Sequence, residues 1–231
     1  MTGIDGRPRH QQIAADLRSL IMSGDCPGRL PTTNELMDTY QVGSPTVRRA
    51  LQVLKDEGFV EGRRGSGVYA RDRHPIDAAS YIPTDGGYAY TLLTVAETRP
   101  PAEVRKAFAL GAADTVILRH RLMTFDGRPA ELSWSYYPLE LAAGTPLAAD
   151  RRIKGGAGKL LAELGFAPVG YRETIASRLP TTYELERLEL PDDVPVIRQC
   201  RSLLTADGRA VETTVMVKGG HRFEVRFAVQ L

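Results

Sequence analysis

Residues 42–70 read VGSPTVRRALQVLKDEGFVEGRRGSGVYA, a stretch that joins a helix start, two arginine pairs and a glycine-rich turn. Ser44 is a good N-cap, and Pro45 suits the first helical position because its missing N–H would be unpaired there anyway. Apolar residues recur at helical spacing to about residue 57, and Gly58 ends the predicted helix. The stretch therefore predicts a helix with a sharply defined start, followed by a turn-rich segment.

A small hairpin and two more helices are predicted around this helix. Residues 59–60 and 68–70 read as short strands around Gly65-Ser66-Gly67. Upstream, residues 10–23 carry four apolar side chains on one helical face. Thr32 and Glu35 have the spacing of a capping box, in which each side chain bonds the other residue's backbone amide. Residues 10–70 are therefore predicted to form three helices followed by a small hairpin.

The arginine pairs indicate the partner of this fold. An inward apolar stripe, formed by Val47, Ala50, Leu51 and Leu54, leaves the polar N-terminal residues of the third helix outside. Such an end can enter a major groove, where a guanidinium pairs with guanine and hydroxyl groups hold phosphate. Arg63 and Arg64 are predicted at the hairpin tip. Each pair alone could equally be a solvated charged face, but together they favour one DNA-facing surface.

Composition and charge limit the class of protein. The chain has 231 residues and a net charge of +2; residues 1–73 contain 11 Lys and Arg against 9 Asp and Glu, and the remainder contains 19 of each. No run of about 18 apolar residues and no secretion signal occur, so we expect a cytoplasmic protein outside the membrane. Cys26 and Cys200 are too isolated for a disulfide framework or a zinc site. No cofactor is indicated.

The sequence GRLPTTNELMDTYQVGSPTVRRALQVLKDEGFVEGRRGSGVYA, residues 28–70, resembles the winged helix-turn-helix of GntR-type bacterial transcription regulators. This chain departs from the family pattern at Gly43-Ser44, where Ser-Arg is common, and at Thr32, where Ser is common. The first departure removes one contact that the family would supply, which leaves the operator sequence open. The resemblance implies DNA contacts from Asn34, Ser44, Thr46, Arg48, Arg64 and Gly65, with backbone contacts from Arg49 and Arg63.

Residues 73–90 lack sustained periodicity and are predicted to link a DNA-binding domain, residues 1–72, to a second domain, residues 91–231. There, RLMTFDGRPAE from Arg121 is echoed by RSLLTADGRAVE from Arg201, and each Asp-Gly marks a hairpin. The predicted helices span 101–110, 158–164 and 181–190, and the predicted strands span 115–125, 130–137, 171–179, 195–205 and 210–218. The pattern predicts an α+β fold: an antiparallel sheet with helices on one side, a pseudo-two-fold relation between its halves, and residues 223–230 closing it.

This second domain resembles the ligand-sensing UTRA domain of the HutC subfamily, built on a fold shared with chorismate lyase. The residues that carry the resemblance are the R-x-R of Arg119 and Arg121, DGRPAELSWSYYP at 126–138, DGRAVE at 207–212 and HRFEVRF at 221–227. Arginines two apart on a strand share a face and suit a carboxylate or phosphate. The residues alone also allow both arginines to pair with Glu131 or Glu212; the resemblance favours a pocket.

The resemblance adds Glu212 as an effector-binding residue. Lys218 stands where the family often has an aromatic side chain, and Gly155-Gly156-Ala157-Gly158 replaces a loop that commonly supplies serine. A lysine and glycine-rich backbone amides can still hold an anion.

Other polar and aromatic residues have structural interpretations. Trp134, Tyr136 and Tyr137 could line the pocket, but core or interface packing is favoured. Arg151, Arg152 and Lys154 are predicted to form a solvated loop. His120 is predicted on the face opposite Arg119 and Arg121, and the histidines show no metal-ligand spacing.

Together these features predict a homodimeric repressor that a small anionic metabolite releases from a near-palindromic operator. A two-fold dimer is expected because one wing domain covers too little DNA to select a site. One alternative is a plasmid or transfer-control repressor whose second domain only dimerises. A distant alternative is a lyase-like enzyme, although no GxSxG or HExxH motif occurs and a shared fold does not carry activity with it.

Overall fold

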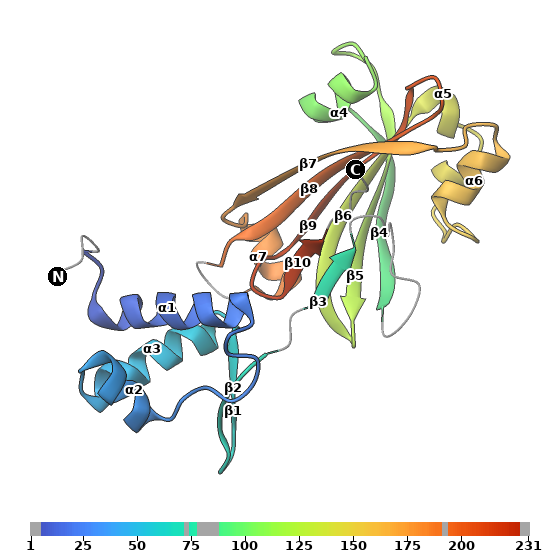
Figure 1. The fold of residues 1–231 in the computed structure, drawn as a ribbon. Helices are drawn as coiled ribbons and strands as arrows, with labels where there is room; N and C mark the ends of the chain where they lie inside the picture. Colours follow the sequence, from blue (N-terminus) through green and yellow to red (C-terminus); the bar gives the residue numbers. More distant parts are fainter. Residues whose placement is uncertain (1–5, 72–73, 78–87, 191–193, 227–231) are drawn as a thin grey trace. The chain divides into compact units, whose positions relative to one another are not determined.

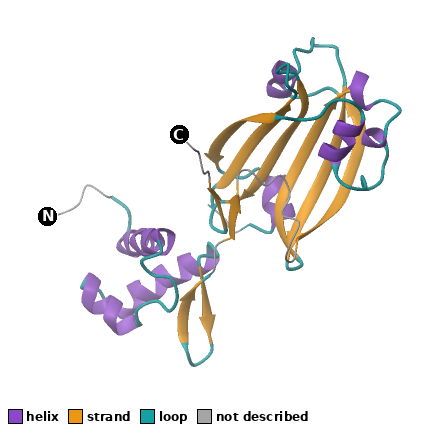
Figure 2. Cartoon of the chain, turned by 45° about the vertical axis from the view of Figure 1, so that its right-hand side comes forward, coloured by secondary structure: helices purple, strands orange, loops and turns teal. Residues whose placement is uncertain are grey.

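The computed structural model describes residues 6–71, 74–77, 88–190 and 194–226. Contacts divide the chain into two compact units, one formed by 1–80, 190–194 and 220–231 and the other by 81–189 and 195–219. Figures 1 and 2 show a helical unit with a small hairpin and a unit built on a broad sheet. Among the described residues, no helix combines the length and apolarity that crossing a membrane requires.

Three helices form the first unit's core. They are α1 (Arg9–Ser23), α2 (Thr33–Tyr40) and α3 (Ser44–Asp56). Apolar side chains at helical spacing bury together: Ile13, Leu17 and Ile21 from α1, Leu36 from α2, and Val47, Ala50 and Leu54 from α3. The guanidinium of Arg18 donates to the carboxylate of Glu57 at 2.9 Å, which ties α1 to the end of α3. The three predicted helices are confirmed.

The helix ends follow local side-chain chemistry. The capping box is present: Thr32 Oγ1 accepts from the Glu35 amide at 3.3 Å, and the Glu35 carboxylate accepts from the Thr32 amide at 2.7 Å. The N-cap of α3 is Gly43, so the prediction of Ser44 as N-cap is wrong by one residue. Ser44 instead adopts helical geometry as the first residue of α3, directly before Pro45.

The wing is the hairpin of β1 (Val60–Arg63) and β2 (Gly67–Ala70). Arg29 bridges to Tyr69 on the outer side of β2. Gly65 and Gly67 have φ of 73° and 118°, left-handed conformations that favour glycine. A Cβ on Gly67 would also lie 3.1 Å from Nε of the Arg29 side chain, a tight contact that this side chain would have to relieve by shifting.

The second unit is built on a six-stranded sheet in the order β4-β5-β6-β9-β8-β7, with every neighbouring pair antiparallel. The strands are β4 (Tyr88–Thr98), β5 (Val116–Phe125), β6 (Arg128–Pro138), β7 (Gly170–Arg178), β8 (Val196–Leu204) and β9 (Ala210–Gly219). Outward from the central β6–β9 pair, β5 and β4 follow β6 on one side, and β8 and β7 follow β9 on the other, so each half consists of three strands that are consecutive in the sequence. This arrangement is what the predicted pseudo-two-fold relation requires.

Helices cover both faces of the sheet, so the prediction of helices on one side is wrong. On one face, α4 (Ala102–Ala107) and α7 (Thr182–Leu188) pack beside Tyr136 and Trp134. On the other lie α5 (Leu139–Ala142), the 3₁₀ helix η1 (Pro146–Ala148) and α6 (Ala157–Glu163). Their side chains Leu141, Leu147 and Leu161 bury against Ile117, Tyr137 and Val211 of the sheet. The long β6–β7 connection therefore supplies a second apolar layer.

The chain end does not close this sheet, in contrast to the prediction for residues 223–230. The strand β10 (Phe223–Arg226) pairs in parallel with β3 (His74–Asp77) in a separate two-stranded sheet, and residues 227–230 lie outside the described part of the chain. A strand after β9 has no place beside it, because β6 and β8 already occupy both of its edges. Within the predicted linker, 73–90, lie β3 and the first residues of β4; residues 73 and 78–87 are outside the described part.

Candidate functional site

The predicted DNA-contacting residues lie on the helix-turn-helix and on the wing. Asn34 is exposed on α2, and Ser44 and Thr46 are half-buried in the first turn of α3. The first arginine pair, Arg48 and Arg49, is exposed on α3 directly beside the buried Val47. Because α3 buries one face against α1, its arginines are left in solvent.

The wing arginines differ from one another. Arg64 and Gly65 are exposed at the turn, and in the described part of the chain Arg64 makes no ion pair. Arg63 pairs with Glu61 at 3.0 Å and lies 4.3 Å from the centre of the Tyr69 ring. Its charge is thus partly compensated within the hairpin, whereas that of Arg64 is available to a phosphate.

A cavity of about 410 Å³ opens in the second unit, beside the predicted arginine pair. Its lining comes from three segments: Tyr88, Ala89 and Tyr90 of β4; Arg119, Arg121 and Met123 of β5; and Arg152, Ile153, Gly155, Gly156 and Ala157 of the loop leading into α6. Three guanidinium groups and no carboxylate are present among these described lining residues. The cavity is therefore suited to an anion.

Arg119 holds the wall of the cavity in place. It is 2% exposed, and its guanidinium donates to the carbonyls of Leu147 at 2.9 Å, Ala149 at 2.8 Å and Arg151 at 2.6 Å. Burial lowers the pKa of this guanidinium. Since both terminal nitrogens are occupied by backbone carbonyls, Arg119 fixes the loop that carries Arg152.

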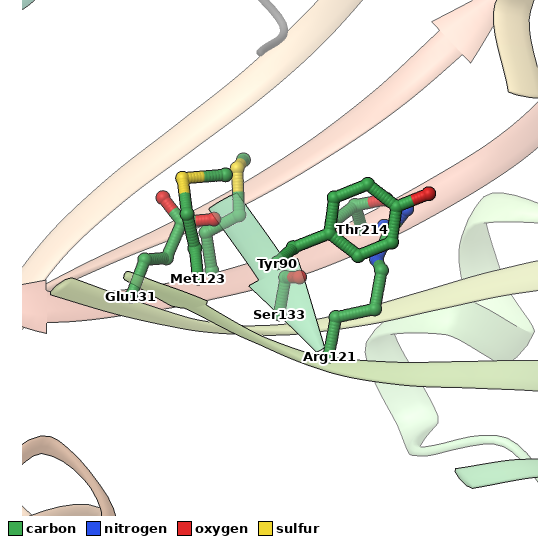
Figure 3. A pocket seen from close by; sticks show the side chains of 7 residues that line it. Tyr90, Arg121, Met123, Glu131, Ser133 and Thr214 are labelled. Atoms are coloured by element: carbon green, nitrogen blue, oxygen red, sulfur yellow. The ribbon is translucent and has the colours of Figure 1, made fainter. Parts of the chain in front are cut away.

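Arg121 and Arg152 present guanidinium groups on one aromatic ring. Arg121 lies 6.0 Å and Arg152 4.8 Å from the centre of the Tyr90 ring. Figure 3 shows the Arg121 side chain reaching the Tyr90 ring, with Glu131 and Met123 at the opposite end of a smaller adjoining pocket. The expectation that Arg152 belongs to a solvated loop is incomplete, because this exposed side chain also lines the cavity.

A hydrogen-bond chain leads from the cavity to Glu212. The Arg121 guanidinium donates to Ser135 Oγ, Ser135 Oγ lies 2.7 Å from Thr214 Oγ1, and Thr214 Oγ1 donates to Glu212 Oε1 at 2.7 Å. Glu212 is fully buried, and burial raises its pKa to about 7. Its Oε2 has no hydrogen-bond partner among the described residues. Glu212 does not line either described cavity.

Lys218 is a buried partner of Glu131. Its Nζ lies 2.7 Å from Glu131 Oε2 and donates to Gln199 Oε1 at 2.6 Å, and the residue is 1% exposed. Glu131 in turn lines the smaller pocket. The alternative in which Arg119 and Arg121 pair with Glu131 or Glu212 is not what the structure shows, since they bind backbone carbonyls and Ser135 instead.

The aromatic residues of β6 pack rather than line the cavity. Trp134 stacks on His120 with ring centres 4.5 Å apart, and Tyr136 and Tyr137 belong to the two apolar cores. His120 lies on the face opposite the arginines, as predicted; in the neutral ring Nδ1 donates to the Ser133 carbonyl, and Nε2 accepts from the Tyr183 hydroxyl at 2.8 Å. The packing interpretation is confirmed.

Among the cavity residues that sequence reasoning missed, Tyr88, Tyr90 and Arg152 carry an aromatic ring or a charge. The period-two spacing of Tyr88 and Tyr90 was a usable strand signal, but both fell within the predicted linker. Nothing local marks Arg152, because contacts with distant residues bring it to the cavity: Arg119 holds the preceding loop, and the Arg152 guanidinium lies over the Tyr90 ring.

A winged helix-turn-helix attached to a sheet domain with an anion-suited cavity defines a class of two-domain DNA-binding transcription regulators. The chain matches the family model of bacterial regulatory proteins of the gntR family over residues 9–70 and that of the UTRA domain over residues 86–224. The UTRA match spans more than half of the chain. The protein therefore belongs to the GntR family of transcription regulators, in the group that carries a UTRA domain, and this family membership indicates a regulator and not an enzyme.

Individual relatives agree over nearly the full length. An HTH-type transcriptional regulator of Streptomyces coelicolor is 28% identical, over 94% of this chain and 90% of its own. The HTH-type transcriptional repressor PhnF of Mycolicibacterium smegmatis is also 28% identical, over 90% of this chain and 92% of its own. The crystal structure of PhnF from Mycobacterium smegmatis superposes with a TM-score of 0.61 and 21% identity, covering 94% of this chain and 100% of that one. This structural likeness shows the shared fold.

Proposed function

We propose that this regulator is a homodimeric repressor that a small anionic effector releases from a near-palindromic operator. The observation that carries the proposal is the cavity of about 410 Å³, with Arg119, Arg121 and Arg152 among its described lining residues and no carboxylate there. One relative, PhnF of Mycolicibacterium smegmatis, is named a repressor, which supports the same direction of control here. A regulator of this kind acts in the cytoplasm, where the chromosome lies.

The proposed DNA contacts divide by role. Arg48, with Ser44 and Thr46 in the same helix start, reads base edges and phosphate in the major groove. Asn34 adds a contact from α2, Arg49 and Arg63 contact the backbone, and Arg64 with Gly65 brings the wing to the duplex. Support comes from the exposure of both arginine pairs and from the helix that positions the first pair.

The operator test is a selection of bound duplexes from a random pool at fixed salt. We expect the intact protein to recover a two-fold symmetric site, and Arg48→Ala to weaken binding to it by about 1–3 kcal/mol. Lys55→Ala is the matched control, because Lys55 is an exposed cation at the other end of α3. Equal loss on operator and random DNA would reduce Arg48 to a phosphate contact.

The proposed effector site divides the arginines into two roles. Arg121 and Arg152 contact the anion, and Arg119 fixes the loop that carries Arg152. Glu212 acts through Thr214 and Ser135 on Arg121, and Lys218 acts through Glu131, which reaches the smaller pocket. A ligand that fills both spaces therefore carries an anionic group at the arginines and a hydroxyl or amine donor near Glu131.

The effector test is thermal unfolding in the presence of phosphate- and carboxylate-bearing metabolites. A ligand at 100 times its Kd adds about 2.7 kcal/mol of stability. Arg121→Ala should abolish this gain, whereas Arg128→Ala, which removes an exposed arginine at the start of β6, should keep it. A stabilising ligand that leaves operator affinity unchanged would contradict the release mechanism. No stabilisation by any anion would favour a repressor whose second domain only dimerises.

A further inference from the structure

The two halves of the six-stranded sheet repeat one arrangement around an arginine. The corresponding hairpins β5–β6 and β8–β9 contain the repeated segments RLMTFDGRPAE, from Arg121, and RSLLTADGRAVE, from Arg201. The strands β4 and β7 correspond as well, because each is the edge strand that pairs with the arginine-bearing strand of its half, as Figure 1 shows. Arg121 and Arg201 therefore occupy matching positions, and their surroundings can be compared residue by residue.

Each of these arginines lies beside a tyrosine of its edge strand. The guanidinium of Arg121 is 6.0 Å from the centre of the Tyr90 ring. The guanidinium of Arg201 is 4.5 Å from the centre of the Tyr171 ring. Both tyrosines come two residues before the position that stands directly opposite the arginine, so they share its face of the sheet. The correspondence of the two halves thus extends from the backbone to the side chains.

The residue directly opposite the arginine differs between the two halves. Glu173 stands opposite Arg201, and Arg201 Nε donates to Glu173 Oε1 at 2.9 Å. These side chains are at most 5% exposed, so the second half contains a buried carboxylate–guanidinium pair. Leu92 stands opposite Arg121, which instead donates to Ser135 Oγ. In the described part of the chain no carboxylate pairs with Arg121, which leaves the matching place open to a free one.

Glu173 accepts hydrogen bonds from two side chains of the second half. Besides the guanidinium of Arg201, Gln199 Nε2 donates to the same carboxylate oxygen at 3.3 Å. The residue that matches Gln199 in the first half is Arg119, which is committed to loop carbonyls. Arg152 lines the cavity and can act as the second donor there. The first half therefore also offers two donors to one acidic group.

We propose that the second half contains an internally occupied copy of the effector site, and that the effector carries a carboxylate, which takes the place at Arg121 that the Glu173 carboxylate takes at Arg201. The inference rests on the proposed function and names the chemical class of its effector. Guanidinium groups pair with phosphate as well as with carboxylate. The group that this fold itself places against the matching arginine is a carboxylate, and that observation decides between the two classes.

Leu92 is then a specificity-determining residue of the effector site. Its half-buried side chain supplies no acid, so the anionic partner of Arg121 has to come from solution. A carboxylate side chain at this position, as in Leu92→Glu, would reproduce the arrangement of the second half. Directly opposed residues of opposite charge attract each other across a strand pair. The substitution therefore converts the ligand site into an internal ion pair.

Thermal unfolding of the full-length protein with two matched probes tests this proposal. Benzoate and phenylphosphonate carry the same ring and differ in the acidic group, and both are used at equal concentration and ionic strength. We expect benzoate to raise the Tm of the wild type and of Leu92→Gln, which adds a polar side chain without charge. Benzoate should not raise the Tm of Leu92→Glu or Arg121→Ala. Phenylphosphonate should raise the Tm of the wild type less than benzoate does.

The same measurements can overturn the proposal. A Tm gain through Arg121 that is larger with phenylphosphonate than with benzoate would refute the carboxylate, and the anionic effector of the proposed function would stand. A benzoate gain that survives in Leu92→Glu, or that is lost equally in Leu92→Gln, would refute the role of Leu92. If Leu92→Glu does not unfold cooperatively, the two probes on the wild type and on Arg121→Ala still decide the class of the effector. If neither probe stabilises the wild type more than Arg121→Ala, the effector site of the proposed function is refuted as well.

Discussion

Replacing Glu212 by glutamine should remove a large pH dependence from the stability of the sheet domain. The Glu212 carboxyl is fully buried, and burial raises its pKa from 4.5 to about 7. Its one described hydrogen-bond donor is the neutral hydroxyl of Thr214. The folded domain therefore holds the carboxyl proton more tightly than the unfolded chain does.

The sign and size of the effect follow from that difference in pKa. Because the folded pKa is the higher one, the free energy of unfolding falls as pH rises from about 4.5 through about 7, and this group adds little further change above about pH 8. At 1.36 kcal/mol for each pKa unit, the whole loss is on the order of 3 kcal/mol. Most of it falls between pH 5 and pH 8. Glutamine cannot titrate, so Glu212→Gln gains stability relative to the wild type across that interval.

Urea unfolding followed by tryptophan fluorescence measures the sheet domain selectively. The chain has a single tryptophan, Trp134, which lies on β6 in the sheet domain. Its partner His120 can alter the amplitude of the signal when it titrates, so the midpoint of unfolding is the quantity to compare. Glu163→Gln is the matched control, because the side chain of Glu163 is 60% exposed. If the difference in unfolding free energy between Glu212→Gln and the wild type stays constant from pH 5 to pH 8, the raised pKa of Glu212 in the folded domain is refuted.

Two further predictions concern residues that hold a site in place. Arg119→Leu should lower the stability of the sheet domain by about 3 kcal/mol in the same urea assay, because three loop carbonyls lose a buried donor. The same substitution should abolish anion binding. Unchanged anion binding would contradict the role of Arg119 in fixing the loop. Thr32→Ala removes the capping box of α2 and should lower the stability of that helix by about 1 kcal/mol. Hydrogen exchange should then be faster for the amides of α2 in the variant than in the wild type. Equal exchange rates in the two proteins would show that packing alone holds the helix.

The DNA-binding domain was largely predictable because its signals are local. The Thr32 to Glu35 capping box, the apolar stripe of α3 and the glycines of the wing each act within a few residues along the chain. Such short-range patterns fix helix starts and turns independently of the rest of the fold. The N-cap lies at Gly43, one residue before the predicted Ser44; glycine caps a helix with only a small loss relative to serine, so local chemistry does not separate the two positions.

The sheet domain shows where local reasoning stops. The two Asp-Gly hairpins and the repeat around them predicted the strands and the symmetry of the sheet. The second helical layer and the place of β10 escaped prediction, because both depend on which faces and edges remain uncovered after the sheet has formed.

The sequence by itself determined the class of this protein, a winged helix-turn-helix regulator with a sensor-type sheet domain, and the face on which Arg119 and Arg121 lie. Only the tertiary structure decided what each buried polar side chain does: Arg119 binds loop carbonyls, Lys218 binds Glu131, and Arg152 reaches the cavity. The reason is physical. A buried charge must find partners, and those partners are brought together from distant segments by packing, which no local pattern records.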